Sequence, residues 1–522
     1  MIGLMRRMWL LDSPYASLFD VSFSFSAAFA VSFLLLSTVT LLAFYRRRFR
    51  YWRDRGIVGP QPRIPSGTAG YLSNVGWHKR DLECVAQFGK VYGTFSGLTP
   101  VLVVADHEVL KEVLIREFAS FADRKVLFSQ CISSSLIGTN GARWREQRTC
   151  LSPTFTSGKL KSLLLLVKAN VDHMLRRLEQ ETAGQGCDVS NVALFGDLTM
   201  GVIASCAFAT DLTDGGRSKR RLDEENEFVK HARRFFELSP FRVALFELLP
   251  ESLRYRFDLT AHSTSFLVDL SREILRQRKQ VNQDSAQKGV IDMLQLMLES
   301  AKKEEGDNGL TDEEIVANMI LVLIAGYDTT KGLLSWTTYE LARRPDIQRQ
   351  LRQEVCEVIK GPEDEANYEA IMSLKYLDAV LNESLRRYPP VVTVDRVASK
   401  DCEIKTLGLK VRKGDTLYLP IYAIHHQADY HPDPFTFDPE RFMPGNKEKM
   451  LPCTFMPFMV GPRNCIGARF ALLEAKAALV AILRRYDLSP SPRQQDPPDL
   501  SHVRFILTPK DIVVNYAPRA GD

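Results

Sequence analysis

The sequence predicts a mainly α-helical domain with a small β part, preceded by one N-terminal transmembrane helix. Three observations lead to this fold class: an uncharged apolar run over residues 21–44, a long stretch of helical periodicity, and only a few short strand-like runs. No interior linker, repeat or low-complexity block appears beyond about residue 70. Residues 68–522 are therefore expected to form one domain, although length alone would allow about three.

The N-terminal segment is predicted to be a membrane anchor. As a helix, residues 21–44 would span about 36 Å, enough to cross a hydrocarbon core with some tilt. Two arginines precede the run and six follow between residues 46 and 55. This bias places residues 1–20 in the lumen and the C-terminal side in the cytoplasm. A cleaved signal peptide is disfavoured because no small-residue cleavage site follows, and a buried core helix is the alternative.

Residues 45–67 combine the basic stretch with prolines and glycines, and we predict a hinge there. Short strands are predicted at residues 90–95, 101–104, 402–411 and 416–419. The formal net charge of the chain is +5. Its nine cysteines contain no C-x-x-C pair and no zinc spacing, which favours a reducing compartment over a disulfide framework.

One cysteine lies in a glycine-flanked loop directly before a predicted apolar helix. The N-terminus of a helix stabilises a thiolate. Gly461 and Gly467 allow a tight turn around the sulfur, Phe458 supplies an apolar wall, and Arg463 can meet an anionic ligand edge. The loop therefore suits Cys465 as a thiolate ligand of haem iron. Over residues 458–467 it reads FMVGPRNCIG.

A capping box at residues 311–314 opens a helix that is predicted to run to Ala342. This helix is apolar nearly all round, yet Asp328 and Thr329 follow Gly326 in its middle. We expect a local bulge there that opens a groove for a small ligand and a proton chain. The alternative is that the threonine hydroxyl only bonds back to the carbonyl four residues earlier.

Two further pairs have helical spacing. Glu383 and Arg386 share one helix face, and their apolar neighbours predict a buried ion pair that needs additional partners. Trp144 and Arg148 also share one face, which suits either a surface helix or the binding of a buried anion. His425, His426 and His431 cluster in a loop, and we predict that they are structural or surface histidines and not metal ligands.

These motifs resemble the cytochrome P-450 superfamily. The cysteine loop matches Phe-x-x-Gly-x-Arg-x-Cys-x-Gly, with Met459 where a small residue is usual. Residues 325–330 match the oxygen-binding pattern Ala/Gly-Gly-x-Asp/Glu-Thr-Thr/Ser, and the likeness extends from about residue 56 to the C-terminus. The resemblance implies the cytochrome P-450 fold, in which haem b lies between two long helices with Cys465 as the iron ligand.

The resemblance also implies roles for individual residues. Thr329 would steady bound dioxygen, and Asp328 would help to deliver protons. Arg441 would join Glu383 and Arg386 in a structural network that serves folding and haem retention. The haem contacts implied are Trp144 and Arg148 in a Trp-x-x-x-Arg helix, together with Arg124, Arg396, Phe458 and Arg463.

Residues 151–161 look like the animal family-three clan of membrane-bound microsomal enzymes. This likeness implies a single-pass endoplasmic reticulum protein with a cytosolic catalytic domain. The activity implied is haem-thiolate monooxygenation of a lipophilic small molecule such as a drug, steroid or fatty compound. Segments expected to contact the substrate are residues 118–135, 235–250 and 391–394.

The chain has no Walker loop or Rossmann fingerprint, so its electrons should come from a partner. The partners implied are an NADPH-dependent flavoprotein reductase and cytochrome b5, with no nucleic acid. Two alternatives stay open: a haem-thiolate isomerase or dehydratase of an organic peroxide, and a non-catalytic membrane haem sensor. Candidate cations for docking the reductase are Arg143, Arg145, Lys447, Lys449 and Arg469.

Overall fold

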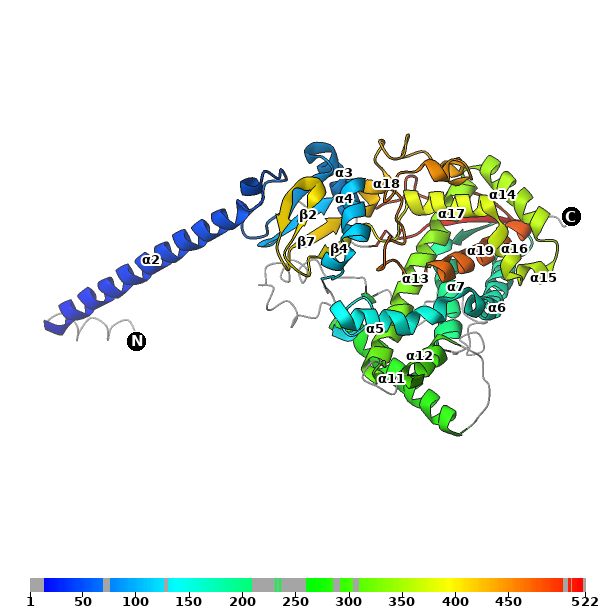
Figure 1. The fold of residues 1–522 in the computed structure, drawn as a ribbon, viewed down its shortest axis with the longest axis horizontal. Helices are drawn as coiled ribbons and strands as arrows, with labels where there is room; N and C mark the ends of the chain where they lie inside the picture. Colours follow the sequence, from blue (N-terminus) through cyan, green and yellow to red (C-terminus); the bar gives the residue numbers. More distant parts are fainter. Residues whose placement is uncertain are drawn as a thin grey trace, which may run out of the picture.

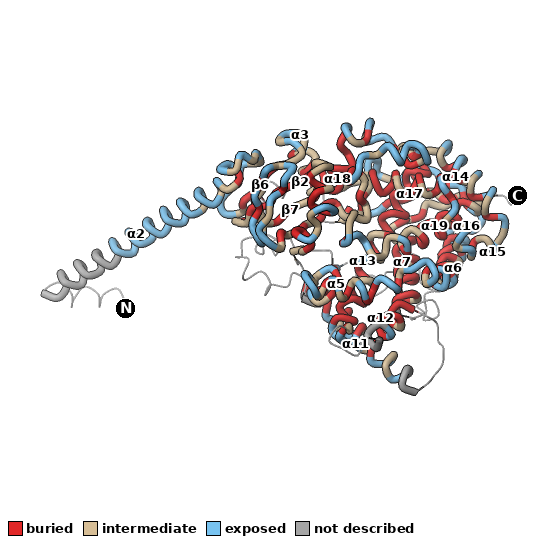
Figure 2. The backbone as a smooth tube through the Cα atoms, viewed as in Figure 1, coloured by how far each residue is buried: buried red, intermediate tan, exposed pale blue. Residues whose placement is uncertain are grey.

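The computed structural model describes a helical body with small sheets and one projecting helix (Figure 1). The projecting helix is α2 (Pro14–Phe49), whose 36 residues extend the predicted anchor at both ends. Its described side chains face solvent along almost their whole length (Figure 2). The part of α2 from Ala28 onward belongs to a span that is long and apolar enough to cross a membrane. The structure describes all residues except 1–13, 69–75, 126–129, 209–230, 232–233, 236–259, 285–291, 304–308, 501–505, 508 and 520–522.

Three small sheets are present in the described chain. The largest has the order β1-β2-β7-β4, in which β2 and β7 are parallel and the other neighbours are antiparallel. The predicted run 402–411 is a hairpin and not one strand, because Gly408 turns the chain with φ 59°. The strands are β1 (Val91–Ser96), β2 (Thr99–Val104), β3 (Cys187–Ser190), β4 (Val394–Val397), β5 (Cys402–Ile404), β6 (Leu409–Val411), β7 (Thr416–Leu419), β8 (Tyr486–Pro490) and β9 (Val513–Pro518).

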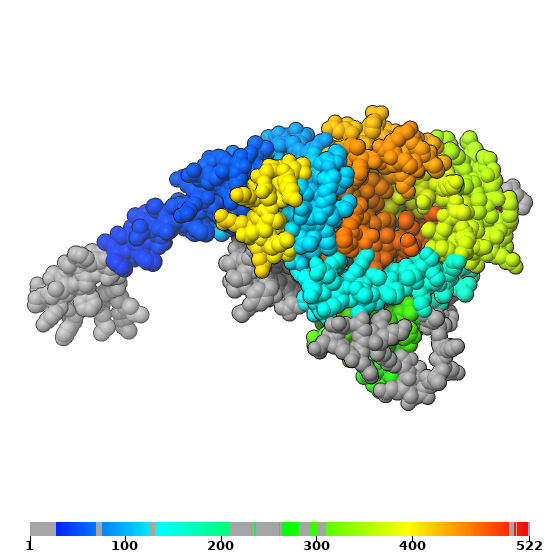
Figure 3. All heavy atoms as spheres, in the orientation of Figure 1, coloured from blue at the N-terminus to red at the C-terminus, as the bar shows by residue number. Residues whose placement is uncertain are grey.

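Helices form most of the rest of the described body. In Figure 3 the orange segment around residues 450–480 lies between the light-blue segment around residue 110 and the lime-green segment around residue 370. The described α-helices besides α2 are α3 (Trp77–Phe88), α4 (His107–Lys111), α5 (Gly141–Leu151), α6 (Ser157–Thr182), α7 (Asn191–Phe208), α11 (Ala261–Asp284), α12 (Met293–Lys303), α13 (Asp312–Ala342), α14 (Pro345–Val358), α15 (Pro362–Glu365), α16 (Tyr368–Ser373), α17 (Lys375–Arg387), α18 (Ile421–His425) and α19 (Ala468–Arg485). Short turns are η1 (Arg53–Arg55), η3 (Glu112–Arg116), η4 (Phe118–Ser120), η5 (Gln130–Ile132), η6 (Ser152–Phe155), η8 (Lys405–Leu407), η9 (Pro439–Phe442) and η10 (Lys447–Lys449).

Helix α13 runs through the core and packs against α7, α17 and α19. Its predicted capping box is confirmed: Glu314 N donates to Thr311 Oγ1 at 3.3 Å, and Thr311 N donates to Glu314 Oε2 at 2.9 Å. The helix is continuous, so the predicted bulge after Gly326 is wrong. The glycine instead leaves room for the Ile203 side chain of α7, because a Cβ at this position would lie 3.0 Å from Cδ1 of Ile203.

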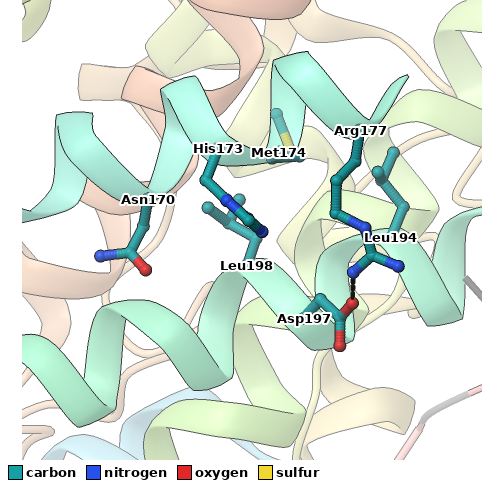
Figure 4. A pocket seen from close by; sticks show the side chains of 7 residues that line it. All are labelled: Asn170, His173, Met174, Arg177, Leu194, Asp197 and Leu198. Atoms are coloured by element: carbon teal, nitrogen blue, oxygen red, sulfur yellow. Dashed lines mark hydrogen bonds and ion pairs between the residues drawn. The ribbon is translucent and has the colours of Figure 1, made fainter. Parts of the chain in front are cut away.

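Helices α6 and α7 lie side by side and enclose a small pocket (Figure 4). An ion pair between Arg177 of α6 and Asp197 of α7 crosses one end of it. None of the lining residues belongs to α13 or to the Cys465 loop, so this pocket is separate from the predicted site. They are Asn170, His173, Met174, Arg177, Leu194, Asp197 and Leu198.

The segment predicted as a hinge makes fixed contacts with the four-stranded sheet. Trp52 is 6% exposed, and its Nε1 donates to the carbonyl oxygen of Thr94 at 2.9 Å. Gly93 N donates to the carbonyl oxygen of Val58 at 2.8 Å. A Cβ on Gly59 would lie 2.0 Å from the carbonyl oxygen of Gly93, so only glycine permits this close approach.

Candidate active site

The loop that carries Cys465 is closed by its own backbone. Cys465 N donates to the carbonyl oxygen of Phe458 at 2.8 Å, and Asn464 N donates to that of Gly461 at 3.1 Å. Gly461 has φ 78°, and a Cβ there would lie 2.2 Å from the carbonyl oxygen of Leu114. Glycine is therefore required at this position both for its backbone conformation and for space.

Met459 is the second left-handed residue of the loop, with φ 59°. A side chain disfavours this conformation, but the apolar side chain of Met459 packs against the core beside the four-stranded sheet. Gly467 has φ −88°, and a Cβ there would meet only Phe155, at 3.9 Å. The expectation that Gly467 supplies the tight turn is wrong, because Met459 and Gly461 supply it.

The sulfur of Cys465 lies at the N-terminus of α19, as predicted. Burial raises the pKa of the Cys465 thiol, whereas the backbone N–H groups of Gly467 and Ala468 and the Arg148 guanidinium act in the opposite direction. The side chain is accessible although many protein atoms surround it, and we infer that it faces an internal hollow. A thiolate here is reachable by a ligand that enters the interior.

Helix α13 presents one accessible face within an otherwise buried helix. Ala325 is exposed although Ile324 and Tyr327 beside it are buried. The accessible positions recur with helical spacing, and because α13 contacts α19 we infer that they border the same interior as Cys465. We call these positions the open stripe: Leu321, Val322, Ala325, Gly326 and Thr329.

The two residues predicted to act on oxygen lie differently on α13. Thr329 belongs to the open stripe, and its Oγ1 donates to the carbonyl oxygen of Ala325 at 2.6 Å. Asp328 is buried beside the stripe, and its carboxylate forms an ion pair with Lys331. The Thr329 side chain therefore borders the hollow, whereas the Asp328 carboxylate points to the buried Lys331 ammonium.

Sequence reasoning missed Lys331. Its ammonium lies 4.5 Å from the centre of the Tyr327 ring, and its stem approaches Gly196 of α7. Burial acts to lower the pKa of Lys331, but the Asp328 carboxylate and Tyr327 outweigh burial and raise it. A lysine three residues after an acid within an apolar helix is the signal that would have revealed the pair.

Three predicted haem contacts converge in an arginine cluster, which consists of Arg124, Arg396 and Arg463. Burial, followed by repulsion from Arg124, lowers the pKa of Arg396 and that of Arg463 to about 9. The Nε atoms of all three are buried without a hydrogen-bond partner. Arg463 also lies over the Trp144 ring, 4.6 Å from its centre.

Asp395 supplies one carboxylate, 4.0 Å from Arg124 Nε. Three guanidinium groups exceed this one charge, and cations removed from water need compensating charge and acceptors, so the cluster suits a further anion. The two carboxylates of haem b would meet this need, and the thiol of Cys465 is a suitable iron ligand. The described residues therefore fit the cofactor that the resemblance implies. Phe458 is partly buried against the core beside the loop.

Arg148 contacts the cysteine loop directly. Its two terminal nitrogens donate to Asn464, to the carbonyl oxygen at 2.9 Å and to Oδ1 at 2.8 Å. Asn140, which sequence reasoning missed, links two members of the arginine cluster. Its Oδ1 accepts from Arg463 Nη2 and from Arg124 N, each at 3.0 Å. No sequence pattern identifies Asn140, because only the fold brings it next to Arg463.

The predicted Glu383–Arg386 pair is fully buried on α17. Two hydrogen bonds of 2.7 Å join the guanidinium to the carboxylate. Arg441 Nε lies 3.7 Å from Glu383 Oε1, so the structure brings all three predicted network residues together. The other guanidinium hydrogens of Arg386 go to the carbonyl oxygens of His425, Pro434 and Thr436.

The three clustered histidines are buried in this same region. His425 Nε2 accepts from Met456 N at 2.9 Å, which links α18 to the start of the cysteine loop. No group of metal-binding side chains occurs among the described residues. Among the docking candidates, Arg143 is bound to Glu314 and Glu146 and therefore does not offer a free charge.

The match to a known family covers most of the chain. The family model described as cytochrome P450 matches residues 60–516. Cytochrome P450 3A11 of Mus musculus is 35% identical over 93% of this chain and 96% of its own length. Cytochrome P450 3A5 of Homo sapiens is 34% identical over 94% of this chain and 96% of its own length. The chain therefore belongs to the cytochrome P450 family of haem-dependent monooxygenases.

Proposed function

We propose that this protein is a membrane-anchored monooxygenase that inserts one oxygen atom of dioxygen into a lipophilic small molecule, such as a drug-like compound, a steroid or a fatty compound. The electrons come from NADPH through a flavoprotein reductase, with cytochrome b5 as a further donor. One observation carries the proposal. Arg463 of the arginine cluster lies two residues before the accessible Cys465, so the same loop offers a sulfur ligand and a buried guanidinium Nε without a hydrogen-bond partner, which together suit one anionic, metal-containing cofactor.

Haem, when bound, supplies the one-electron and dioxygen chemistry. The chain's own residues have separate tasks. Cys465 provides the thiolate, and the arginine cluster provides donors for two carboxylates. The open stripe supplies an apolar wall from Leu321 to Ala325, with the Thr329 hydroxyl as its polar atom. That hydroxyl can accept or pass a proton at the edge of the hollow, and Asp328 lies one residue away.

A spin-state screen tests the substrate class. Lipophilic compounds that displace water from the interior should shift the haem spectrum, whereas polar compounds of similar size should not. Product should then form from the compounds that bind, only when the reductase and NADPH are both present.

The same assay separates the alternatives. Rearrangement of an organic peroxide without the reductase would favour the isomerase or dehydratase. A haem protein that forms no product with any ligand under either condition would favour a sensor. Segments 118–135 and 235–250, proposed to contact the substrate, lie partly outside the described residues.

The proposed location is the endoplasmic reticulum membrane with the catalytic domain in the cytosol. Support comes from the length and exposure of α2 and from the six arginines that follow its apolar part. Removing residues 1–50 should release most of the protein from the membrane and leave haem uptake intact. Protection of residues beyond 60 from protease in sealed microsomes would contradict the cytosolic orientation.

A further inference from the structure

A dense cluster of positive charge follows the apolar part of the anchor. Residues 46–55 contain six arginines and one aspartate, a net charge of +5, which equals the formal net charge of the whole chain. Most of these arginines are exposed on the last turns of α2 and the turn that follows. The end of the anchor therefore attracts an anionic surface.

One face of α2 changes from apolar to cationic along its length. Val39, Leu42 and Ala43 are followed at helical spacing by Arg46, Arg47 and Arg50. These residues and Asp54 line a surface groove, which we call the headgroup groove. From Ala43 to Arg47 the helix rises about 6 Å, close to the thickness of about 5–7 Å that one headgroup layer adds to the hydrocarbon core.

Packing on the sheet fixes the C-terminal end of the groove. The helical path continues for one more turn after α2, where Asp54 N donates to the carbonyl oxygen of Arg50 at 2.8 Å. Trp52 and Tyr51 fix this turn: Trp52 Nε1 donates to Thr94, and Tyr51 Oη donates to Asp415 Oδ2 at 3.0 Å. The wall formed by the turn is therefore ordered before any ligand binds.

The arginines of residues 46–55 differ in the contacts that their side chains make with the rest of the protein. Arg48 Nε donates to the carbonyl oxygen of Leu98 at 2.9 Å, and Arg55 stacks 3.7 Å from the Tyr51 ring centre. Arg50 shares its charge with Asp54 at 3.4 Å. Arg46 and Arg47 are exposed and line the groove, and their side chains make no hydrogen bond or ion pair with the residues that the structure describes.

We propose that the headgroup groove binds an anionic phospholipid of the bilayer, with its acyl chains along Val39, Leu42 and Ala43 and its phosphate and carboxylate groups on Arg46 and Arg47. The proposal rests on the proposed anchor. The positive charges of Arg46 and Arg47 favour an anionic ligand. The apolar half of the same face favours a lipid with acyl chains over a free phosphate. The bound lipid would help to set the orientation of the domain, because the groove is fixed to the sheet through Trp52.

The test uses the full chain in phosphatidylcholine bilayers that contain spin-labelled phosphatidylserine or spin-labelled phosphatidylcholine. The motionally restricted fraction of each label gives the relative affinity. We expect the wild type to favour phosphatidylserine about fivefold or more, the effect of roughly one surface arginine. Arg46→Gln/Arg47→Gln should lose most of this preference. Arg53→Gln/Arg63→Gln removes the same charge from exposed positions outside the groove and should keep it.

Other results would overturn the proposal. Equal affinity for both lipids in the wild type, or equal loss in both double variants, would mean that no groove-bound lipid exists. Unchanged lipid preference together with weaker reductase binding in Arg46→Gln/Arg47→Gln would assign the arginines to a protein partner. Removal of the wild-type chain from the bilayer by alkaline carbonate would refute the proposed membrane anchor. This result differs from those that refute the lipid site alone.

Discussion

The ion pair between Asp328 and Lys331 should behave as one energetic unit. The two side chains are 8% and 3% exposed, so neither charge is well solvated. Lys331→Met removes the cation that neutralises the Asp328 carboxylate, which should lower the free energy of unfolding by about 3–5 kcal/mol. Asp328→Asn should cost a similar amount, because it leaves the buried ammonium uncompensated.

The double variant Asp328→Asn/Lys331→Met carries neither charge. It should be more stable than either single variant, with a coupling energy of about 2 kcal/mol or more. Denaturant unfolding of the detergent-solubilised full chain, followed by tryptophan fluorescence, measures all four proteins. Costs that add within about 0.5 kcal/mol would refute the argument, since independent sites add in this way.

Three further predictions concern single sites. Met459→Gly should unfold with a free energy about 1 kcal/mol higher than that of Met459→Ala in the same assay, because φ is 59° and both variants lack the methionine side chain; equal stability would mean that the turn is unstrained. Thr329→Ala should consume more reductant per product and release more peroxide, whereas wild-type coupling would leave the hydroxyl only its bond to Ala325. Burial raises the pKa of Glu474 well above its usual range, so this carboxyl stabilises the fold below its ordinary pKa, and stability falls by about 1.4 kcal/mol per pH unit as the pH rises towards the folded pKa. Glu474→Gln should flatten that slope, and an unchanged slope between pH 5 and 7 would contradict the assignment.

Local motifs could be predicted from the sequence alone. The capping box at Thr311, the helix that follows Cys465 and the buried Glu383–Arg386 pair depend on residues near one another in the chain. Helical periodicity and end signals act over one or two turns, so one sequence is enough to recognise them.

Features that depend on distant contacts could not be predicted in the same way. Gly326 was expected to open a bulge, but its small size serves the approach of Ile203 from α7, which no local pattern reveals. Likewise Asn140 meets Arg463 across 323 positions of sequence. The prolines and glycines of residues 56–67 predict a hinge, and composition does not show that Gly59 packs on Gly93.

The reduced carbon monoxide spectrum of Cys465→His tests the central claim most directly. We expect the purified wild type to show the red-shifted band of a thiolate-ligated haem, and the variant to retain haem but lose that shift. Histidine can still ligate iron, so the change isolates the sulfur from haem binding as such. A variant that kept the thiolate-type band would show that another cysteine is the ligand and would contradict the account of this site.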